Sequence, residues 1–259
     1  MTPEKRQEDV PGTHDPMPGG SRRVMRWSIL FCLLAGMALC FYFMAEAPPA
    51  VRAMLWFHYG MRIVLVVLAL AAWFLSQALI GSRGLRAGEL GDGLHEFTAP
   101  GHRFLQEHPD VANAVLIISS AFIDLFGIFL IGVGIFGASL RPLVALFIVF
   151  IFRQVSQVLC ALPAPPGMIW RYPGFPSLLV TYSVANEFFI SGHTAIAVLG
   201  AIEAVHLFSG WVGAAACGVA CLEAAVVIVL RAHYTMDVLG AAAAAWCAAH
   251  LAGLLCTVM

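Results

Sequence analysis

The chain has 259 residues, of which 61% are hydrophobic and 11% are charged, and its formal net charge is −1. A soluble globular domain carries about 25% charged residues, so this composition excludes an ordinary soluble protein and indicates a membrane protein. A net charge this close to zero gives no reason to expect a nucleic-acid partner, and we expect none. Residues 1–24, rich in proline, glycine and charge, are predicted to form a disordered tail.

Hydropathy predicts an all-α polytopic membrane bundle with six or seven transmembrane spans. The candidate spans are about 25–45, 61–80, 111–137, 143–160, 190–208, 212–231 and 235–257. The first span has an alternative, because Ala45-Glu46-Ala47 resembles a signal-peptidase site. Its apolar run is longer than a usual signal core, which favours a retained span over a cleaved signal. We expect residues 25–94 to hold the N-terminal spans and the start of a loop, followed by the main membrane domain at 95–258.

Two long polar connections interrupt the spans, and with seven spans both fall on one face of the membrane. The connection 81–110 contains His95, His102 and His108, whose spacings of seven and six residues match no metal-ligand pattern. We expect these to be solvated loop histidines. The connection 161–189 contains five prolines, which exclude a continuous helix, so we expect a structured loop or a re-entrant cap.

Two short polar motifs lie near the C-terminal half of the apolar sequence. They are residues 191–194 (Ser-Gly-His-Thr) and residues 231–237 (Arg-Ala-His-Tyr-Thr-Met-Asp). The two apolar stretches between them are each long enough to cross most of a bilayer, so they predict a hairpin that returns the chain to its starting face. The sequence therefore predicts that His193, His233 and Asp237 meet at one end of this hairpin.

The chemistry of these residue types suits a bound phosphate. Ser191 is a good N-cap and Gly192 allows a ligand or backbone to approach closely, so the helix start favours an anion beside His193. His233 and Asp237 share a helical face at i, i+4, where the carboxylate would fix the imidazole tautomer and leave the other nitrogen free as a nucleophile. The alternatives are a capped helix with an interfacial histidine and a polar pair at the membrane boundary.

These motifs resemble those of a known group. Residues 191–194 and 233–238 are similar to the sphingomyelin synthase branch of the type 2 phosphatidic acid phosphatase superfamily and to plant phosphatidylcholine:diacylglycerol cholinephosphotransferase. Residues 153–167 resemble that branch's arginine-containing helix and proline loop. The resemblance covers roughly 95–258, which we expect to be the catalytic domain. It implies a membrane enzyme that moves a phosphocholine- or phosphoethanolamine-type head group from a glycerophospholipid to the hydroxyl of diacylglycerol or ceramide.

The resemblance also implies a phosphohistidine mechanism with no metal and no other cofactor. His233 would attack the phosphorus while Asp237 holds its ring, and His193 would protonate the departing oxygen and then deprotonate the incoming hydroxyl. The expected partners are a phospholipid donor and a lipid-alcohol acceptor. The other expected site residues are the phosphate-binding Arg231, Arg153, Ser191 and Gly192, and the head-group- or acceptor-binding Glu187, Tyr182, Trp170 and Tyr234.

The chain departs from the phosphatase relatives, whose signature opens with Lys-x6-Arg-Pro. Arg141-Pro142 matches the end of that signature, but Gly134 stands where lysine would be, and Arg141 is predicted at the turn opposite the site. The departure favours a transferase over the alternative, a lipid phosphate phosphatase of the same superfamily.

Several charged residues are predicted within the spans, where a charge is costly unless it is paired or faces a polar cavity. We expect Arg153 either to pair with Asp124 or to bind phosphate, and the two roles are compatible. Glu203 and Glu223 are expected to form contacts between helices, with His206 as a candidate partner of Glu203, or to line an acceptor chamber. The remote alternative is a proton- or ion-coupled transporter that uses these acids. We expect a multi-pass protein of the bacterial inner (plasma) membrane.

Overall fold

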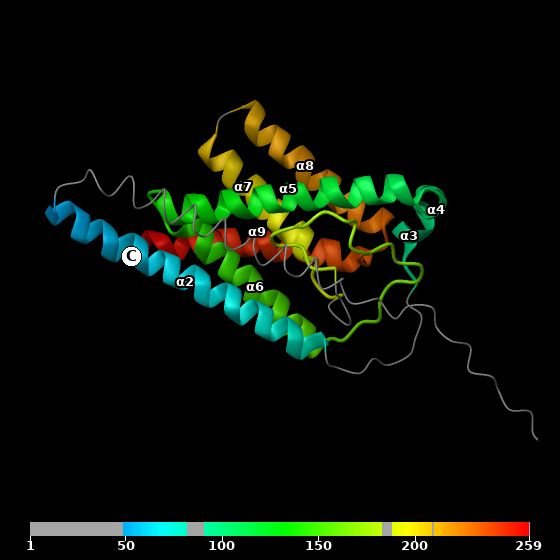
Figure 1. The fold of residues 1–259 in the computed structure, drawn as a ribbon, viewed down its shortest axis with the longest axis horizontal. Coiled ribbons are helices and arrows are strands. Elements are labelled where there is room, and N and C mark those ends of the chain that lie inside the picture. The colour runs from blue at the N-terminus through cyan, green and yellow to red at the C-terminus, as the bar shows by residue number, and fades with distance from the viewer. Residues whose placement is uncertain (1–48, 82–90, 183–187, 209, 259) are drawn as a thin grey trace, which may run out of the picture.

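A computed structural model describes residues 49–81, 91–182, 188–208 and 210–258. The predicted tail, the span at 25–45 and the signal-peptidase-like site lie outside these residues. Over the described ranges the chain is helical and contains no strand, which confirms the all-α membrane bundle (Figure 1). The helices are α2 (Pro49–Gly81), α3 (Gly93–Phe97), α4 (Ala99–Glu107), α5 (Pro109–Phe136), α6 (Arg141–Leu159), α7 (Gly192–Leu207), α8 (Trp211–Val229) and α9 (Thr235–Val258).

Helices α2, α5, α6, α8 and α9 are long and apolar enough to cross a membrane, and the apolar helix α7, with 16 residues, is shorter. The bounds of α5 to α9 lie within two residues of the last five predicted spans. Helix α2 differs, because it begins at Pro49 and not near residue 61. Residues 49–60, which precede the predicted span 61–80, are therefore helical.

Helix α2 continues through the polar position Arg62 because carbonyl oxygens elsewhere in the fold accept hydrogen bonds from its side chain. Its side chain is 6% exposed and donates to the carbonyl oxygens of Ile135 at 2.7 Å, Gly137 at 3.1 Å and Gly134 at 3.4 Å. The last carbonyls of a helix lack intrahelical partners and carry partial negative charge. Arg62 therefore holds α2 against the C-terminal end of α5.

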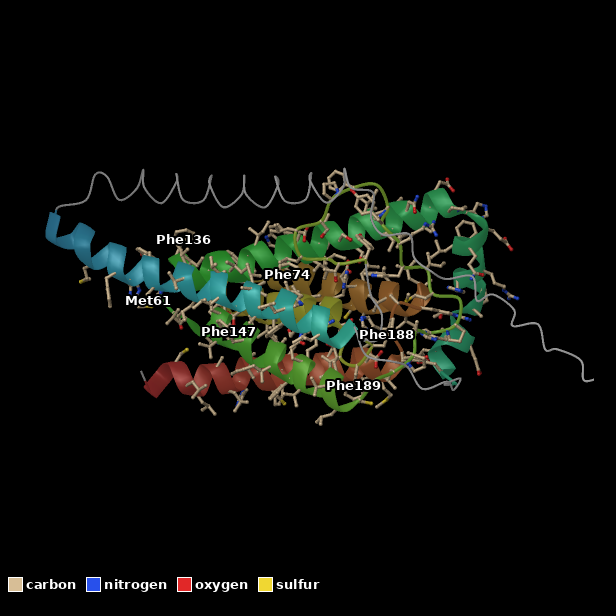
Figure 2. All side chains as sticks on the ribbon, turned by 60° about the horizontal axis from the view of Figure 1, so that its bottom comes forward. Met61, Phe74, Phe136, Phe147, Phe188 and Phe189 are labelled. Carbon is tan, nitrogen blue, oxygen red and sulfur yellow. The ribbon has the colours of Figure 1, made fainter. Side chains whose placement is uncertain are left out.

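Helices α7 and α9 form the centre of the bundle. Helix α7 packs against α5, α8 and α9, while α6 packs along α9. Both central helices bury small side chains, which let backbones approach closely in a membrane: Ala195, Ala197, Ala201 and Ala204 on α7, and Ala241, Ala245, Ala248 and Ala252 on α9. Helices α3 and α4 lie at one end of the bundle, and Figure 2 shows most nitrogen- and oxygen-tipped side chains at that same end.

The connection between α6 and α7 contains no regular helix in its described part and packs onto the bundle. Its Ile169 N–H donates to the carbonyl of Leu230 at 2.8 Å. The carboxylate of Asp124 accepts from the Ser177 hydroxyl at 2.9 Å and from two backbone N–H groups of the same turn at 2.8 and 2.9 Å. The described part of the connection is therefore structured, as its prolines predict, and we call it the cap. Both oxygens of Asp124, the expected partner of Arg153, accept hydrogen bonds from it.

The other buried acids make contacts between helices. Glu203 pairs with Arg141 at 2.7 Å, at the α5–α6 turn, and Glu223 accepts from the Ser119 hydroxyl. His206, expected as a candidate partner of Glu203, instead contacts a carbonyl of its own helix at 2.7 Å. The predicted polar contacts between helices are present, with Arg141 as the unexpected partner.

Candidate active site

A cavity of about 50 Å³ lies where the start of α7 meets the segment that precedes α9. His193 and His233 both line it, together with Arg153 from α6, Trp170 from the cap and Gly192. Two histidines that are forty positions apart are therefore brought to one space at the end of the bundle, as the hairpin predicts.

His193 stands in the first turn of α7, whose start is fixed by the Ser191 hydroxyl accepting from the Thr194 N–H at 3.3 Å. The imidazole is 8% exposed and packs edge-on against Trp170, with ring centroids 5.0 Å apart at 82°. Its Nε2 is buried and has no hydrogen-bond partner among the described residues. A buried polar atom without a partner is costly, so this nitrogen is suited to bind a substrate group.

His233 lies beside the carboxylate of Asp237. Its Nδ1 is 3.4 Å from Oδ2 of Asp237, and the same oxygen accepts from the Tyr234 N–H at 3.0 Å. With Nδ1 directed at the carboxylate, Nε2 is the ring nitrogen left for chemistry. Asp237 also joins the two motifs, because its carbonyl accepts from the N–H of Ser191 at 3.1 Å.

Two histidines that we expected to be solvated, His95 and His102, instead contact the chain at and before His233. His95 and His102 are 6% and 2% exposed and so are buried, whereas His108 is exposed. His95 Nε2 contacts the carbonyl of His233 at 2.9 Å, and His102 Nδ1 contacts the carbonyl of Val229 at 2.8 Å. A carbonyl only accepts, so these contacts require the Nε2–H tautomer of His95 and the Nδ1–H tautomer of His102.

Asp92 completes this arrangement by capping two helices at once. Its carboxylate accepts from the N–H of Thr235 at 2.6 Å and from the Thr235 hydroxyl, and also from the N–H groups of Leu94 at 3.0 Å and His95 at 3.2 Å. Burial by itself would raise the pKa of Asp92, but the bonds from Thr235 and His95 hold it below the usual value. We call Asp92, His95 and His102 the polar strap.

The spacing of His95 and His102 in the sequence does not reveal the strap, because His95 lies on α3 and His102 on the separate helix α4. Their partners are more than 120 positions away along the chain, so their targets are visible only in the folded structure.

Arg231 is directed away from the cavity. Its backbone is in the left-handed region, with φ of +51°, and its Nη1 donates to the carbonyl of Pro166 in the cap at 3.0 Å. It is not among the residues that line the cavity. Of the two arginines expected at the phosphate, the structure places Arg153 at the histidine pair and Arg231 against the cap.

The expected head-group residues are dispersed. Trp170 lines the cavity, while the hydroxyl of Tyr182 contacts that of Ser120 on α5, and the ring of Tyr234 stacks on His95. Glu187 lies outside the described residues.

The sequence motifs did not predict two aromatic residues of the cavity wall. They are Trp73, from α2, and Phe188, whose ring centroid lies 6.1 Å from that of His233. Trp73 belongs to a helix outside the region of resemblance, so no motif pointed to it. Within the described ranges, no three His, Cys, Asp or Glu residues are grouped so that they could hold a metal ion.

A family model described as AtPDCT1/2 matches residues 92–254, which is more than half of the chain. Searches of curated proteins and of solved structures found no match. The matched region begins at Asp92 of the polar strap and includes both histidine motifs. The chain therefore belongs to the AtPDCT1/2 family, of the phosphatidylcholine:diacylglycerol cholinephosphotransferase type, and is a multi-pass membrane phosphotransferase.

Proposed function

We propose that the protein transfers phosphocholine from a phosphatidylcholine-type donor to diacylglycerol through a covalent intermediate on His233. The observation that carries this proposal is the shared cavity, in which each histidine has one ring nitrogen available. Membership of a cholinephosphotransferase-type family supports the choice of head group and acceptor. The plant origin of this family gives no support to the location in the bacterial inner membrane that we expected.

In the first step, Nε2 of His233 attacks the donor phosphorus. The new P–N bond replaces the P–O bond to the glycerol oxygen, and His193 gives that oxygen a proton, so diacylglycerol leaves. In the second step, His193 takes the proton of an incoming diacylglycerol hydroxyl. The acceptor oxygen attacks phosphorus, the P–N bond breaks, and both histidines return to their starting forms.

Asp237 supports the nucleophile through orientation and charge. Its carboxylate, 1% exposed, stabilises the positive charge that develops on the imidazole of His233 as the P–N bond forms. Arg153, 9% exposed and in the wall of the same cavity, would stabilise the negative phosphoryl oxygens. A charge in a site this secluded acts more strongly than it would in water.

The test is an exchange assay in lipid nanodiscs. Phosphatidylcholine with a labelled choline head group is supplied together with diacylglycerol whose acyl chains differ in mass from those of the donor. We expect labelled phosphatidylcholine with the acceptor's chains. We expect His233→Ala to abolish its formation and His193→Ala to slow it by about 10²–10⁴-fold, the usual contribution of a general acid–base. The matched control is His206→Ala, an exposed histidine on α7, which should retain activity.

Product analysis separates the proposal from its rivals. Label released only as free phosphocholine or phosphate, with no new lipid, would assign the site to a phosphatase and overturn the transferase. Full activity of His233→Ala would overturn the covalent mechanism. A parallel reaction with ceramide distinguishes the acceptors, and we expect diacylglycerol to be the better one because of the family.

A further inference from the structure

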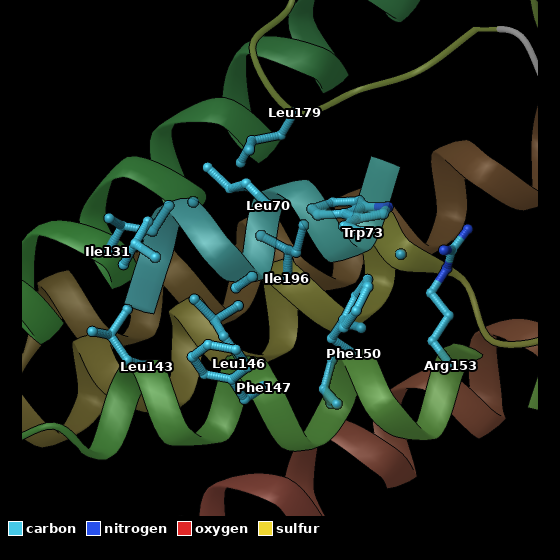
Figure 3. A pocket seen from close by; sticks show the side chains of 16 residues that line it. Leu70, Trp73, Ile131, Leu143, Leu146, Phe147, Phe150, Arg153, Leu179 and Ile196 are labelled. Carbon is cyan, nitrogen blue, oxygen red and sulfur yellow. The ribbon is translucent and has the colours of Figure 1, made fainter. Parts of the chain in front are cut away.

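A second cavity, of about 100 Å³, adjoins the histidine cavity. Five residues line both: Trp73, Arg153, Leu179, Gly192 and Ile196. Apart from Arg153, the walls of the second cavity are formed by apolar and glycine residues of α2, α5, α6, α7 and the cap (Figure 3). The cavity therefore has a charged end next to the histidines and an apolar body that runs away from them.

The apolar body follows α6. Its lining residues on this helix start at Leu143 and end at Arg153, and Figure 3 shows them along one side of the helix. These two positions are ten residues apart, which corresponds to about 15 Å of helix. A bilayer has a hydrocarbon core about 30 Å thick, so the lining residues on α6 extend over about the thickness of a single leaflet.

Helix α2 forms the outer wall, and its sequence separates two faces. Val66, Ala69, Leu70 and Trp73 recur at helical spacing and line the cavity, whereas neighbours such as Leu68 and Leu75 are 60% and 67% exposed. One stripe of α2 thus lines the cavity, and the opposite face of the helix is exposed. Among the described residues, α2 is the helix that lines this side of the cavity.

We propose that this cavity binds one acyl chain of the lipid substrate, with the substrate phosphate at Arg153 and the histidine pair. The proposal rests on the proposed function, because it identifies the occupant by continuity with that site. A phospholipid combines an anionic group with a hydrocarbon chain of leaflet length. The anionic group matches the Arg153 end of the cavity, and the chain matches its apolar body. An apolar space of this kind does not retain water well, so a hydrocarbon chain is the fitting occupant.

The cavity is expected to select by fit more than by overall affinity. Within a membrane, an acyl chain gains little hydrophobic free energy on moving from lipid to protein, because both surroundings are apolar. Narrowing the cavity should therefore change the KM for long-chain substrates and the preference for chain length. The effect on kcat should be smaller for a substrate whose chains are too short to enter the cavity.

The direct test is photo-crosslinking with a phosphatidylcholine that carries a diazirine in the middle of one acyl chain. The protein is the full chain with His233→Ala, so binding is measured without turnover. We expect crosslinks on the cavity-lining residues of α2 and α6. Ala69→Trp, which fills the cavity, should reduce them several-fold, and Ala72→Trp, on the exposed face of the same helix, should not. Ala69→Leu provides a milder filling if the larger side chain prevents folding.

The results distinguish this inference from the proposed function. Crosslinks spread over the exposed face of α2, or equal labelling of Ala69→Trp and Ala72→Trp, would overturn the acyl-chain site even in an active transferase. Crosslinks within the cavity would support it even if the exchange assay gave only phosphatase products. In the chain with His233 intact, Ala69→Trp should raise the KM for long-chain donors several-fold relative to short-chain donors, and an unchanged ratio would count against the proposal.

Discussion

The polar strap makes a specific prediction for Asp92→Ala. This carboxylate caps α3 and α9 together, and α9 begins two residues after the proposed nucleophile His233. Removing it should loosen the segment that carries the imidazole while leaving the cavity walls in place. We therefore expect both lower stability and a lower kcat, with little change in the KM for the donor.

The magnitude follows from the number of bonds that are lost. Replacing an N-cap residue by alanine costs about 0.5–2 kcal/mol, and here one side chain caps two helices, so we expect a loss of about 1–4 kcal/mol. The kinetic effect can be larger than the loss of stability implies, because a displacement of about 1 Å in a reacting group can cost about 10²-fold in rate. Asparagine is also a good N-cap, so Asp92→Asn should fall between the wild type and Asp92→Ala.

The assay combines thermal unfolding in nanodiscs with the exchange reaction measured at temperatures where each variant is folded. Asp110→Ala is the matched control, because Asp110 is an exposed carboxylate in the first turn of α5. Its loss should cost about 0.3–1 kcal/mol through the helix dipole and leave kcat unchanged. If Asp92→Ala behaves like Asp110→Ala in both measurements, the polar strap does not position His233.

Three further predictions concern other parts of the fold. Burial lowers the pKa of His102 below its usual value, so as the pH falls the unfolded chain takes up the proton before the folded chain does. The stability of the fold should therefore be full above about pH 6.5 and fall as the pH drops below it. The decrease in the thermal midpoint should be smaller for His102→Asn, which keeps a hydrogen-bond donor but does not titrate. Arg141→Ala leaves Glu203 buried at 1% exposure without its cation, which should cost about 3–5 kcal/mol in denaturant unfolding, while the exchange rate per folded molecule is unchanged because the pair lies at the opposite end of the bundle. Gly200→Ala would place a Cβ 2.2 Å from an α5 aromatic ring and should cost about 1–3 kcal/mol, whereas Gly132→Ala, which meets nothing within 4 Å, should not destabilise in the same melt.

The membrane helices were predictable from their hydropathy, and several of their ends also carry local markers. Helices α5 and α6 have proline in their first turn, α7 begins after the N-cap Ser191, and α8 follows Gly210, which adopts φ of +66°. The start of α2 was missed because the predicted span began at residue 61, next to Arg62. Its charge is satisfied by carbonyls more than 70 positions away, which no local pattern reports.

The candidate site was predictable in part for the same reason. The i, i+4 spacing of His233 and Asp237 and the hairpin between the motifs are local, and they bring the imidazoles to one cavity. The contribution of Trp73 and the burial of His95 and His102 depend on long-range packing. A histidine in a polar connection looks solvated until the carbonyl that it contacts is known.

The two helices that meet at the cavity differ in the charge that caps them. A helix N-terminus is equivalent to roughly half a positive charge. At α9 that charge is offset by the carboxylate of Asp92, whereas at α7 the cap is the neutral hydroxyl of Ser191. A phosphodiester in the proposed site would therefore be drawn to the α7 side, where Gly192 and Arg153 line the same cavity. Phosphate oxygens held on that side would leave the phosphorus open to the proposed nucleophile His233 and the lipid oxygen near His193, and the carboxylate of Asp92 would disfavour a second anion at the start of α9.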